Sequence, residues 1–375
     1  MSSLTIREVT SKKEFYQFID FPHDLYKGDK HYVPELFMAQ KDLLNTKKHP
    51  FFEYGEIKLN LAYQDGKIVG RIAAIKNPAY NDYHQSNIGF FGFYDYIEDV
   101  SVAKALLDKA KEQLKNEKYD RLMGPVNFST NETAGTLVEG FDSPPQVMMT
   151  YNKPYYDTLQ NEIGLTKEMD LLAFFIPSFE ASDRSIKMSE ILAMRLKRQG
   201  ITIRNIDIKN IKKDAAQLRL LYNSAWEKNW GFVPMNEKEF NVLVGDLKMI
   251  ADPKFSYIAE KDGKAIGFSV SLPNINEITI NFKKGRLLPF NIFKLLLRKS
   301  KVKSVRIITA GVLEEYRRKG IEAIFFAKNI LEARNRNLRG GEASWILESN
   351  QEMVTAAEKL NGKRYKTYRI YTCEA

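Results

Sequence analysis

A basic turn late in the chain carries the residues with the clearest chemical potential. The apolar run Ile307–Val312 predicts a strand, and Arg317–Lys319, Gly320 and Ile321 follow where a helix should begin. The first turn of a helix presents unpaired N–H groups and a partial positive charge. Basic side chains before it, and a glycine that lets an anion approach closely, suit a pyrophosphate. An ordinary basic loop between a strand and a helix is the alternative interpretation.

Two other stretches combine residue types that bind ligands. The segment Gly124–Pro145 is long and has little periodicity, and long loops in compact domains are often binding loops. We expect it to help form an acceptor site between two domains, through the polar groups of Asn127, Ser129, Asn131 and Glu132. A turn-rich loop that satisfies its own backbone fits the segment equally well. Trp226 and Trp230 follow a predicted helix and would wall an apolar acceptor pocket, although core packing is the commoner fate of such aromatics.

Positive charge is concentrated in one part of the sequence. The chain has a net charge of +10, and Lys283–Arg339 alone holds 16 basic residues and four acidic ones. Such a field attracts phosphates, nucleic acid or an anionic membrane, and a solvated basic face is the alternative. Because no zinc-finger, helix-turn-helix or RNA-binding pattern occurs, the sequence disfavours nucleic acid. The histidines have no metal-ligand spacing, so we expect no metal (His23, His31, His49 and His84).

The composition also indicates the cellular compartment of the protein. Hydrophobic residues make up 44% of the chain, which is too many for a disordered protein. A single cysteine, Cys373, excludes a disulfide scaffold, and no run approaches the ~20 apolar residues of a membrane span. The first residues lack the apolar core of a signal peptide. These features predict a cytoplasmic protein, with a contact at the inner membrane face as the alternative.

The elements that must position these residues occur twice. Asp65-Gly66 and Asp262-Gly263 each join two strand-like runs, as in a β-hairpin. Each hairpin is followed by a predicted strand, helix, strand and short helix. The order predicts two copies of one α/β module, with an N-terminal domain over residues 1–180, a linker helix over 181–200 and a C-terminal domain over 201–375.

The second half resembles the GNAT N-acyltransferase superfamily. That family has a strand ending in Val, then R/Q-x-x-G-x-G/A at the start of a helix, and here Val312 precedes Arg317–Glu322. Ser344–Asn350 looks like the family's fifth strand with its terminal Asn. The first half resembles a degenerate copy, because the acidic run Asp95–Asp99 stands where the basic turn should be. The resemblance implies an α/β (α+β) fold of two tandem GNAT-like domains, each a mixed, mostly antiparallel sheet flanked by helices.

The resemblance also implies roles for particular residues. An acyl-CoA would be bound by Val312, Arg317, Arg318, Lys319, Gly320, Ile321 and Asn350. Glu348 is the candidate general base of a direct attack by an amine. Ala357 stands where the family has the Tyr that acts as general acid, so Tyr365 is the candidate substitute. Glu322 replaces the last Gly or Ala of the motif, and its carboxylate would oppose a pyrophosphate unless it points away.

The predicted function is an acyl-CoA-dependent N-acyltransferase, first of all an N-acetyltransferase that uses acetyl-CoA and acts on a small-molecule amine. One alternative uses a longer acyl-CoA and a lipid-like amine at the membrane surface. Gly285–Lys299 mixes apolar and basic residues like an interfacial helix, and a packed helix with a basic outer face is the competing interpretation. The other alternative is a non-catalytic protein that binds CoA or another phosphate ligand.

Overall fold

The computed structural model describes residues 4–115, 119–207 and 211–375. The chain forms two compact units, and each is made from several segments. The first unit contains Met1–Leu171, Thr279–Lys294 and Lys366–Ala375, and the second contains Leu172–Ile278 and Leu295–Tyr365. The predicted domains 1–180 and 201–375 follow chain order, whereas these units exchange segments, so the domain boundaries remain a sequence-based prediction.

The first unit is built on a mixed, mostly antiparallel sheet, as the sequence predicts. Its strand order is β1-β2-β3-β4-β5-β13, and β6 also pairs with β13. The strands are β1 (Leu4–Glu8), β2 (Glu56–Gln64), β3 (Lys67–Lys76), β4 (Ile88–Tyr96), β5 (Arg121–Gly124), β6 (Thr136–Glu139) and β13 (Lys363–Glu374). Only the β4–β5 pair is parallel among the strand pairs described in this unit.

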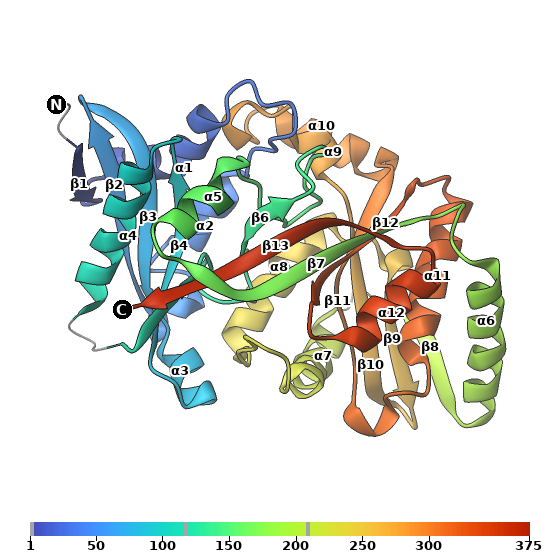
Figure 1. Cartoon of the computed structure of the whole chain (residues 1–375). Helices are drawn as coiled ribbons and strands as arrows, with labels where there is room; N and C mark the ends of the chain where they lie inside the picture. Colours follow the sequence, from blue (N-terminus) through green and yellow to red (C-terminus); the bar gives the residue numbers. More distant parts are fainter. Residues whose placement is uncertain (1–3, 116–118, 208–210) are drawn as a thin grey trace. The chain divides into compact units, whose positions relative to one another are not determined.

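Helices cover both faces of this sheet. They are α1 (Lys12–Leu25), α2 (Phe37–Leu43), α3 (Pro78–His84), α4 (Val100–Leu114) and α5 (Tyr155–Glu162). Successive strand residues point to opposite faces. Ile72 of β3 therefore packs in the core with residues of α4, while the neighbouring Arg71 lies over the ring of Phe18 on α1. Figure 1 shows α4 beside β2 and β3. One face is thus an apolar core, and the other holds a buried charge.

The two predicted hairpins are confirmed. Asp65 and Gly66 have φ angles of 50° and 76°, and Asp262 and Gly263 have φ angles of 51° and 74°. Positive φ at both central residues defines the turn that matches the natural twist of two antiparallel strands. β2 and β3 accordingly pair from Glu56 to Gln64 in the first unit, and β9 pairs with β10 in the second.

The second unit repeats the arrangement. Its strand order is β7-β12-β11-β10-β9-β8, with β11 and β12 parallel. The strands are β7 (Thr166–Pro177, which enters this unit at Leu172), β8 (Ile201–Asn205), β9 (Ser256–Lys261), β10 (Lys264–Pro273), β11 (Ser304–Val312) and β12 (Gly340–Leu347). Alternation again separates the faces, because Tyr257 packs with α11 and its neighbour Ile258 packs with α7 and α8.

The remaining helices are α6 (Asp183–Arg198), α7 (Ile211–Trp226), α8 (Glu237–Ile250), α9 (Asn276–Thr279), α10 (Asn291–Arg298), α11 (Ile321–Asn335) and α12 (Gln351–Lys359). Short 3₁₀ helices lie at Pro50–Glu53, Pro253–Phe255, Lys283–Gly285, Lys299–Lys301 and Glu314–Tyr316. The region predicted as a linker helix is helical, but α6 is not an isolated connector. Its Ile186 and Leu196 are buried in the cores of the second unit.

Candidate functional site

The parallel strands β4 and β5 of the first unit pair along only part of β4. They pair over Ile88–Phe90, after which the chain leaves β5 and crosses β4. A Cβ on Gly92 would lie only 2.1 Å from the carbonyl oxygen of Val126, so this crossing requires glycine. The Asn127 side chain holds the crossing, since its Oδ1 accepts from the Phe93 N–H (2.8 Å) and its Nδ2 donates to Thr133 Oγ1 (2.7 Å).

A cavity of about 90 Å³ opens beside this crossing. It is lined by Pro22, Tyr26, Tyr32, Val33, Glu35, Arg71, Phe93, Tyr94, Asp95, Pro125, Asn127, Thr133, Ala134, Gly135, Thr136, Met149, Thr150, Tyr151, Asn152 and Tyr156. All of these residues belong to the first unit. A space of this size holds several water molecules or the reacting atoms of a substrate, and it does not enclose a whole acyl-CoA.

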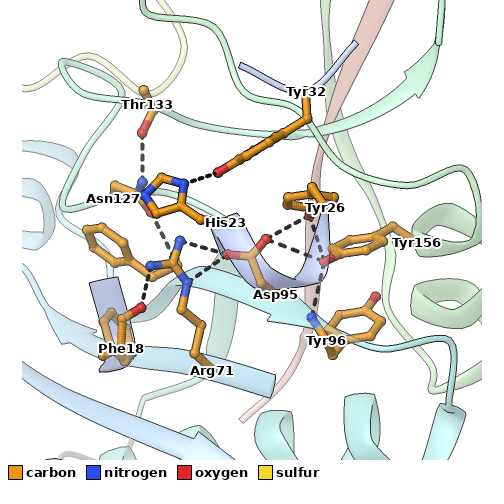
Figure 2. Close-up of polar contacts among 11 residues, drawn as sticks. Phe18, His23, Tyr26, Tyr32, Arg71, Asp95, Tyr96, Asn127, Thr133 and Tyr156 are labelled. Carbon is orange, nitrogen blue, oxygen red and sulfur yellow. Dashed lines mark hydrogen bonds and ion pairs between the residues drawn. The ribbon is translucent and has the colours of Figure 1, made fainter. Parts of the chain in front are cut away.

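A buried ion pair forms the floor of the cavity. Arg71 and Asp95 face each other across β3 and β4, and the Arg71 Nη2 and Nε atoms both lie 2.7 Å from Asp95 Oδ2. Arg71 is 4% exposed, and its Nη1 donates to the carbonyl oxygen of Phe18 (2.9 Å; Figure 2). Removing one member of such a pair leaves an uncompensated buried charge, so the two are expected to act as a unit.

Two tyrosines extend this pair. The Tyr26 hydroxyl donates to Asp95 Oδ1 (2.9 Å) and lies 2.9 Å from the Tyr156 hydroxyl, which also accepts from the Tyr96 N–H (3.1 Å). Figure 2 shows these groups converging on Asp95. Burial and the nearby Asp95 carboxylate raise the pKa of Tyr26 and of Tyr156 well above 10. Both phenols therefore keep their protons at neutral pH and serve as hydrogen-bond donors.

Glu35 supplies a carboxyl group to the same cavity. Burial raises its pKa, the Arg71 guanidinium lowers the pKa in part, and the Asp95 carboxylate raises it further. The residue is nevertheless partly exposed, because the cavity reaches it. A carboxyl group with a raised pKa accepts a proton more readily than an ordinary carboxylate and can return it.

Tyr32 lines the same cavity and contacts His23. The Tyr32 hydroxyl and His23 Nδ1 are 2.8 Å apart. Burial, together with the charges of Arg71 and Arg286, lowers the pKa of His23 to about 4, so its imidazole is neutral at pH 7. Burial and the Glu35 carboxyl raise the pKa of Tyr32, which is therefore a further phenol that keeps its proton in the cavity.

The predicted acceptor residues of the first half occupy the loop after β5. Asn127 lines the cavity. Ser129, Asn131 and Glu132 instead hold the loop together, because Ser129 Oγ accepts from the Asn131 N–H (3.1 Å) and donates to Glu132 Oε2 (3.3 Å). The loop therefore partly follows the alternative interpretation of a segment that satisfies its own polar groups.

The predicted phosphate turn lies in the second unit, between β11 and α11. Gly320 has φ of 80° and stands at the N-terminus of α11, where Ile321 is fully buried. The Arg317 guanidinium turns inward, with Nη2 donating to the Ala225 carbonyl (2.7 Å) and Nε to the Val312 carbonyl (3.3 Å). Its charge thus ties α7 to the end of β11 rather than facing solvent.

The other charged groups of this turn lie at its surface. Arg318 is exposed and forms an ion pair with Glu352 (3.3 Å), while the Lys319 Nζ lies 4.7 Å from the centre of the Tyr316 ring. Glu322 turns its carboxyl group towards its own N–H, and burial raises the pKa of that carboxyl. The helix start therefore already holds an acidic group, which an incoming pyrophosphate would have to displace or meet in protonated form.

The candidate acid and base of the second unit lie around β12. The Tyr365 hydroxyl donates to Glu342, which is fully buried beside Arg306 (Nε to Oε1, 3.4 Å). Asn350 caps α12 by accepting from the Met353 N–H (3.1 Å), and the Glu348 carbonyl accepts from Gln351 (2.8 Å). The Tyr365 hydroxyl thus already donates its proton to a hydrogen bond with a buried ion pair, which limits its use as a general acid.

The two tryptophans differ in their surroundings. Trp226 stacks on Tyr222 with ring centres 5.6 Å apart, and its Nε1 would lie 3.2 Å from a Cβ on Gly311 of β11. It therefore packs at the sheet of the second unit, close to the end of the strand that carries Val312. Trp230 is partly exposed in the turn after α7.

The sequence reasoning missed the residues that line the floor of the cavity. Arg71 is the lone charge within the apolar strand Ile68–Ile75, and Asp95 directly follows the apolar run Ile88–Tyr94. Charged residues inside apolar strand patterns are rarely buried unless they are paired. An isolated charge next to an apolar strand is thus a signal for a buried pair, but the acidic run Asp95–Asp99 conceals this signal at Asp95.

Neither a metal-binding cluster nor a membrane-spanning helix occurs in the part of the chain that the structure describes. Among residues 4–115, 119–207 and 211–375, no cluster of three or more His, Cys, Asp or Glu is arranged to hold a metal ion. None of the helices in those ranges combines the length and the apolarity that crossing a bilayer needs.

Comparison with known proteins identifies the family. No protein-family model matches the chain. Protein YghO of Escherichia coli (strain K12) is 34% identical over 373 residues, covering 98% of this chain and 94% of YghO. The bacterial ceramide synthase of Caulobacter vibrioides is 34% identical over 380 residues, covering 99% of this chain and 97% of that protein.

Solved structures agree on the fold. A tandem GNAT protein from the clavulanic acid biosynthesis pathway matches with a TM-score of 0.58 at 11% identity, covering 99% of this chain and 98% of that one. A GCN5-related N-acetyltransferase from Sphaerobacter thermophilus matches with a TM-score of 0.53 at 11% identity, covering 99% and 95%. The chain therefore belongs to the family of the bacterial ceramide synthase and YghO, and it has the tandem fold of the GNAT superfamily.

Proposed function

We propose that this protein transfers an acyl group from an acyl-CoA thioester to the amine of a lipid-like acceptor. The observation that carries the proposal is the 34% identity to a bacterial ceramide synthase over 99% of the chain. A ceramide is an amide between a fatty acid and a long-chain amino alcohol. Of the two chain lengths expected from the sequence, this relationship favours the longer acyl-CoA over acetyl-CoA.

We place the chemistry in the cavity of the first unit. The amine nitrogen attacks the thioester carbonyl, the C–N bond forms and the C–S bond breaks. Glu35 accepts the proton that the amine loses and returns it to the departing sulfur, which leaves as CoA thiol. Its raised pKa supports both transfers, because the ideal catalytic pKa lies near the working pH. The Tyr32 hydroxyl would donate a hydrogen bond to the developing thiolate.

The second unit is the alternative location. There Val312, Arg317, Arg318, Lys319, Gly320, Ile321 and Asn350 would bind the CoA phosphates and pantetheine, with Glu348 and Tyr365 as base and acid. Three contacts weigh against it: Arg317 is bound internally, Glu322 lies at the helix start, and Tyr365 serves Glu342. The aromatics Trp226 and Trp230 would then wall the acceptor pocket.

A turnover assay tests the function and its location together. The full chain is given palmitoyl-CoA or acetyl-CoA with a long-chain 2-amino-1,3-diol or with ethanolamine, and the amide is measured by mass spectrometry. We expect the long-chain amide as the main product. Glu35→Gln should lower kcat by about 10²-fold or more, because that is the usual contribution of a general base. The wild-type rate should also rise with pH through the raised pKa of Glu35, and this rise should vanish in the variant.

Matched variants decide between the outcomes. Asp65→Asn changes a carboxylate in a hairpin turn that tolerates Asn, and it should leave the rate unchanged. If Glu348→Gln abolishes turnover and Glu35→Gln does not, the reaction belongs to the second unit. CoA binding without amide formation from any amine would reject the enzyme and favour the binding protein.

A further inference from the structure

The segment that leads into α10 exposes an unusual amount of apolar surface. Phe290 is 73% exposed, Phe293 is 62% exposed and Leu297 is 75% exposed. Leu288 and Leu296 are exposed as well. Large aromatic side chains bury 150–250 Å² each when they are covered, so leaving two of them in water forgoes a large stabilisation. A continuous stretch of this kind marks an interaction surface.

The spacing of these residues gives the helix one free face. Phe293 and Leu297 are four residues apart on α10, so they lie on one side of the helix, and Phe290 directly precedes it. Leu295 points the other way and is buried, which anchors α10 to the protein. The exposed face is therefore a property of one short, anchored helix.

The charge of the same stretch is entirely positive. Residues 279–303 contain eight Lys and Arg and no Asp or Glu. Lys284 pairs with Asp24 and Arg286 with Asp20, both within the first unit. Lys294 and Arg298 remain exposed on α10 itself, next to the apolar face. Apolar and aromatic residues flanked by Lys and Arg suit the boundary between lipid headgroups and acyl chains.

This segment is packed against the part of the chain that carries Glu35. A Cβ on Gly285 would lie 1.8 Å from the Glu35 carbonyl oxygen, so the two backbones are in direct contact. The Arg286 guanidinium lies 3.4 Å from the centre of the Phe37 ring. The segment that leads into α10 is therefore in direct contact with the segment that lines the cavity.

We infer that residues 288–298 dock on an anionic lipid bilayer, which presents the lipid-like acceptor to the cavity of the first unit. The delivery of the acceptor rests on the proposed function, whereas the docking itself does not. Helix α6 is the rival surface, since Met188, Ile191 and Met194 are 57–60% exposed. It is less suited because none of these exposed apolar residues is aromatic.

Vesicle co-sedimentation of the full chain tests the docking without any substrate. The probes are pure phosphatidylcholine vesicles and vesicles with half phosphatidylglycerol. We expect binding to the anionic vesicles that weakens as salt is raised. Lys294→Gln with Arg298→Gln should weaken it by about 25-fold, because each basic residue near such a surface contributes about fivefold. Phe290→Ser with Phe293→Ser and Leu297→Ser should weaken it by at least about tenfold, since apolar area is lost.

The control is the triple change Met188→Ser, Ile191→Ser and Met194→Ser, which should leave vesicle binding unchanged. Loss of binding in this control but not in the α10 variants would overturn the assignment. So would equal binding to both vesicle types, or a change of oligomeric state in the α10 variants without any change in vesicle binding. Amide formation in detergent without vesicle binding would reject the docking and keep the proposed function. Vesicle binding without turnover would keep the docking and reject the proposed function.

Discussion

His23 shows how burial alone changes the behaviour of a residue. A solvent-exposed imidazole titrates near pH 6.5, whereas burial and two nearby guanidinium groups lower the pKa of His23 to about 4. Between about pH 4 and 6.5, His23 is protonated in the unfolded chain and neutral in the folded chain. Stability therefore falls as the pH is lowered from about 6.5 to about 4.

His23→Asn removes this titration and keeps a polar atom near the position of Nδ1 for Tyr32. We expect the wild type to lose about 2–3 kcal/mol more unfolding free energy than the variant when the pH falls from 7 to 4.5. Urea unfolding at the two pH values measures the difference. His31→Asn, which changes a partly exposed imidazole, should keep the full acid sensitivity. Parallel pH profiles for wild type and His23→Asn would contradict the lowered pKa.

At the scale of elements, the turn before α11 is set by one backbone conformation. Gly320 has φ of 80°, which disfavours any other residue, and its missing side chain leaves room for Leu192. The glycine is thus explained by local sterics as well as by the approach of an anion. Only a ligand measurement separates these two reasons.

Gly320→Asp provides that measurement when it is paired with Gly200→Asp. Gly200 has the same φ of 80° but nothing within 4 Å of a built Cβ, so it reproduces the backbone strain outside the turn. If the turn binds CoA, Gly320→Asp should abolish CoA binding in calorimetry, while Gly200→Asp should retain it. Equal melting temperatures would show that both variants are folded. Unchanged affinity in Gly320→Asp would remove the turn from the CoA site.

At the scale of the whole molecule, the end of the chain completes the first unit. Strand β13 pairs with β5 over Tyr371–Glu374 and with β6 over Thr367–Arg369. Tyr371 is fully buried in the core under α4, and its hydroxyl donates to Asp157. The sheet of the first unit therefore depends on a strand that is far from its other strands in the sequence.

Tyr371→Ala should destabilise the first unit by about 3–5 kcal/mol, as is usual for deleting a buried aromatic ring. Tyr371→Phe keeps the ring and should cost only about 1 kcal/mol. Hydrogen exchange locates the effect: we expect faster exchange in β4 and β5, far away in sequence, and little change in β9. Faster exchange confined to the second unit would contradict this assignment of β13.

The regular elements were predictable because their causes are local. Asp65-Gly66 and Asp262-Gly263 fix hairpin turns through the backbone angles that these residues tolerate. The turn at Gly320 and the GNAT resemblance were likewise visible in one short stretch, and the comparisons confirm the GNAT fold. The exchange of segments 279–294 and 366–375 between units has no local cause, so chain order alone did not reveal it.

The sequence by itself therefore determined the fold class, the hairpins and the amphipathic helix near residue 290. Only the tertiary structure decided which polar groups meet. Tyr26, Arg71, Asp95 and Tyr156 are separated by up to 130 residues and converge because β3, β4, α1 and α5 pack around one cavity. Burial in that cavity then raises the pKa values of Glu35, Tyr26 and Tyr156. Such shifts depend on solvent exclusion and neighbouring charge, which no spacing along the chain encodes.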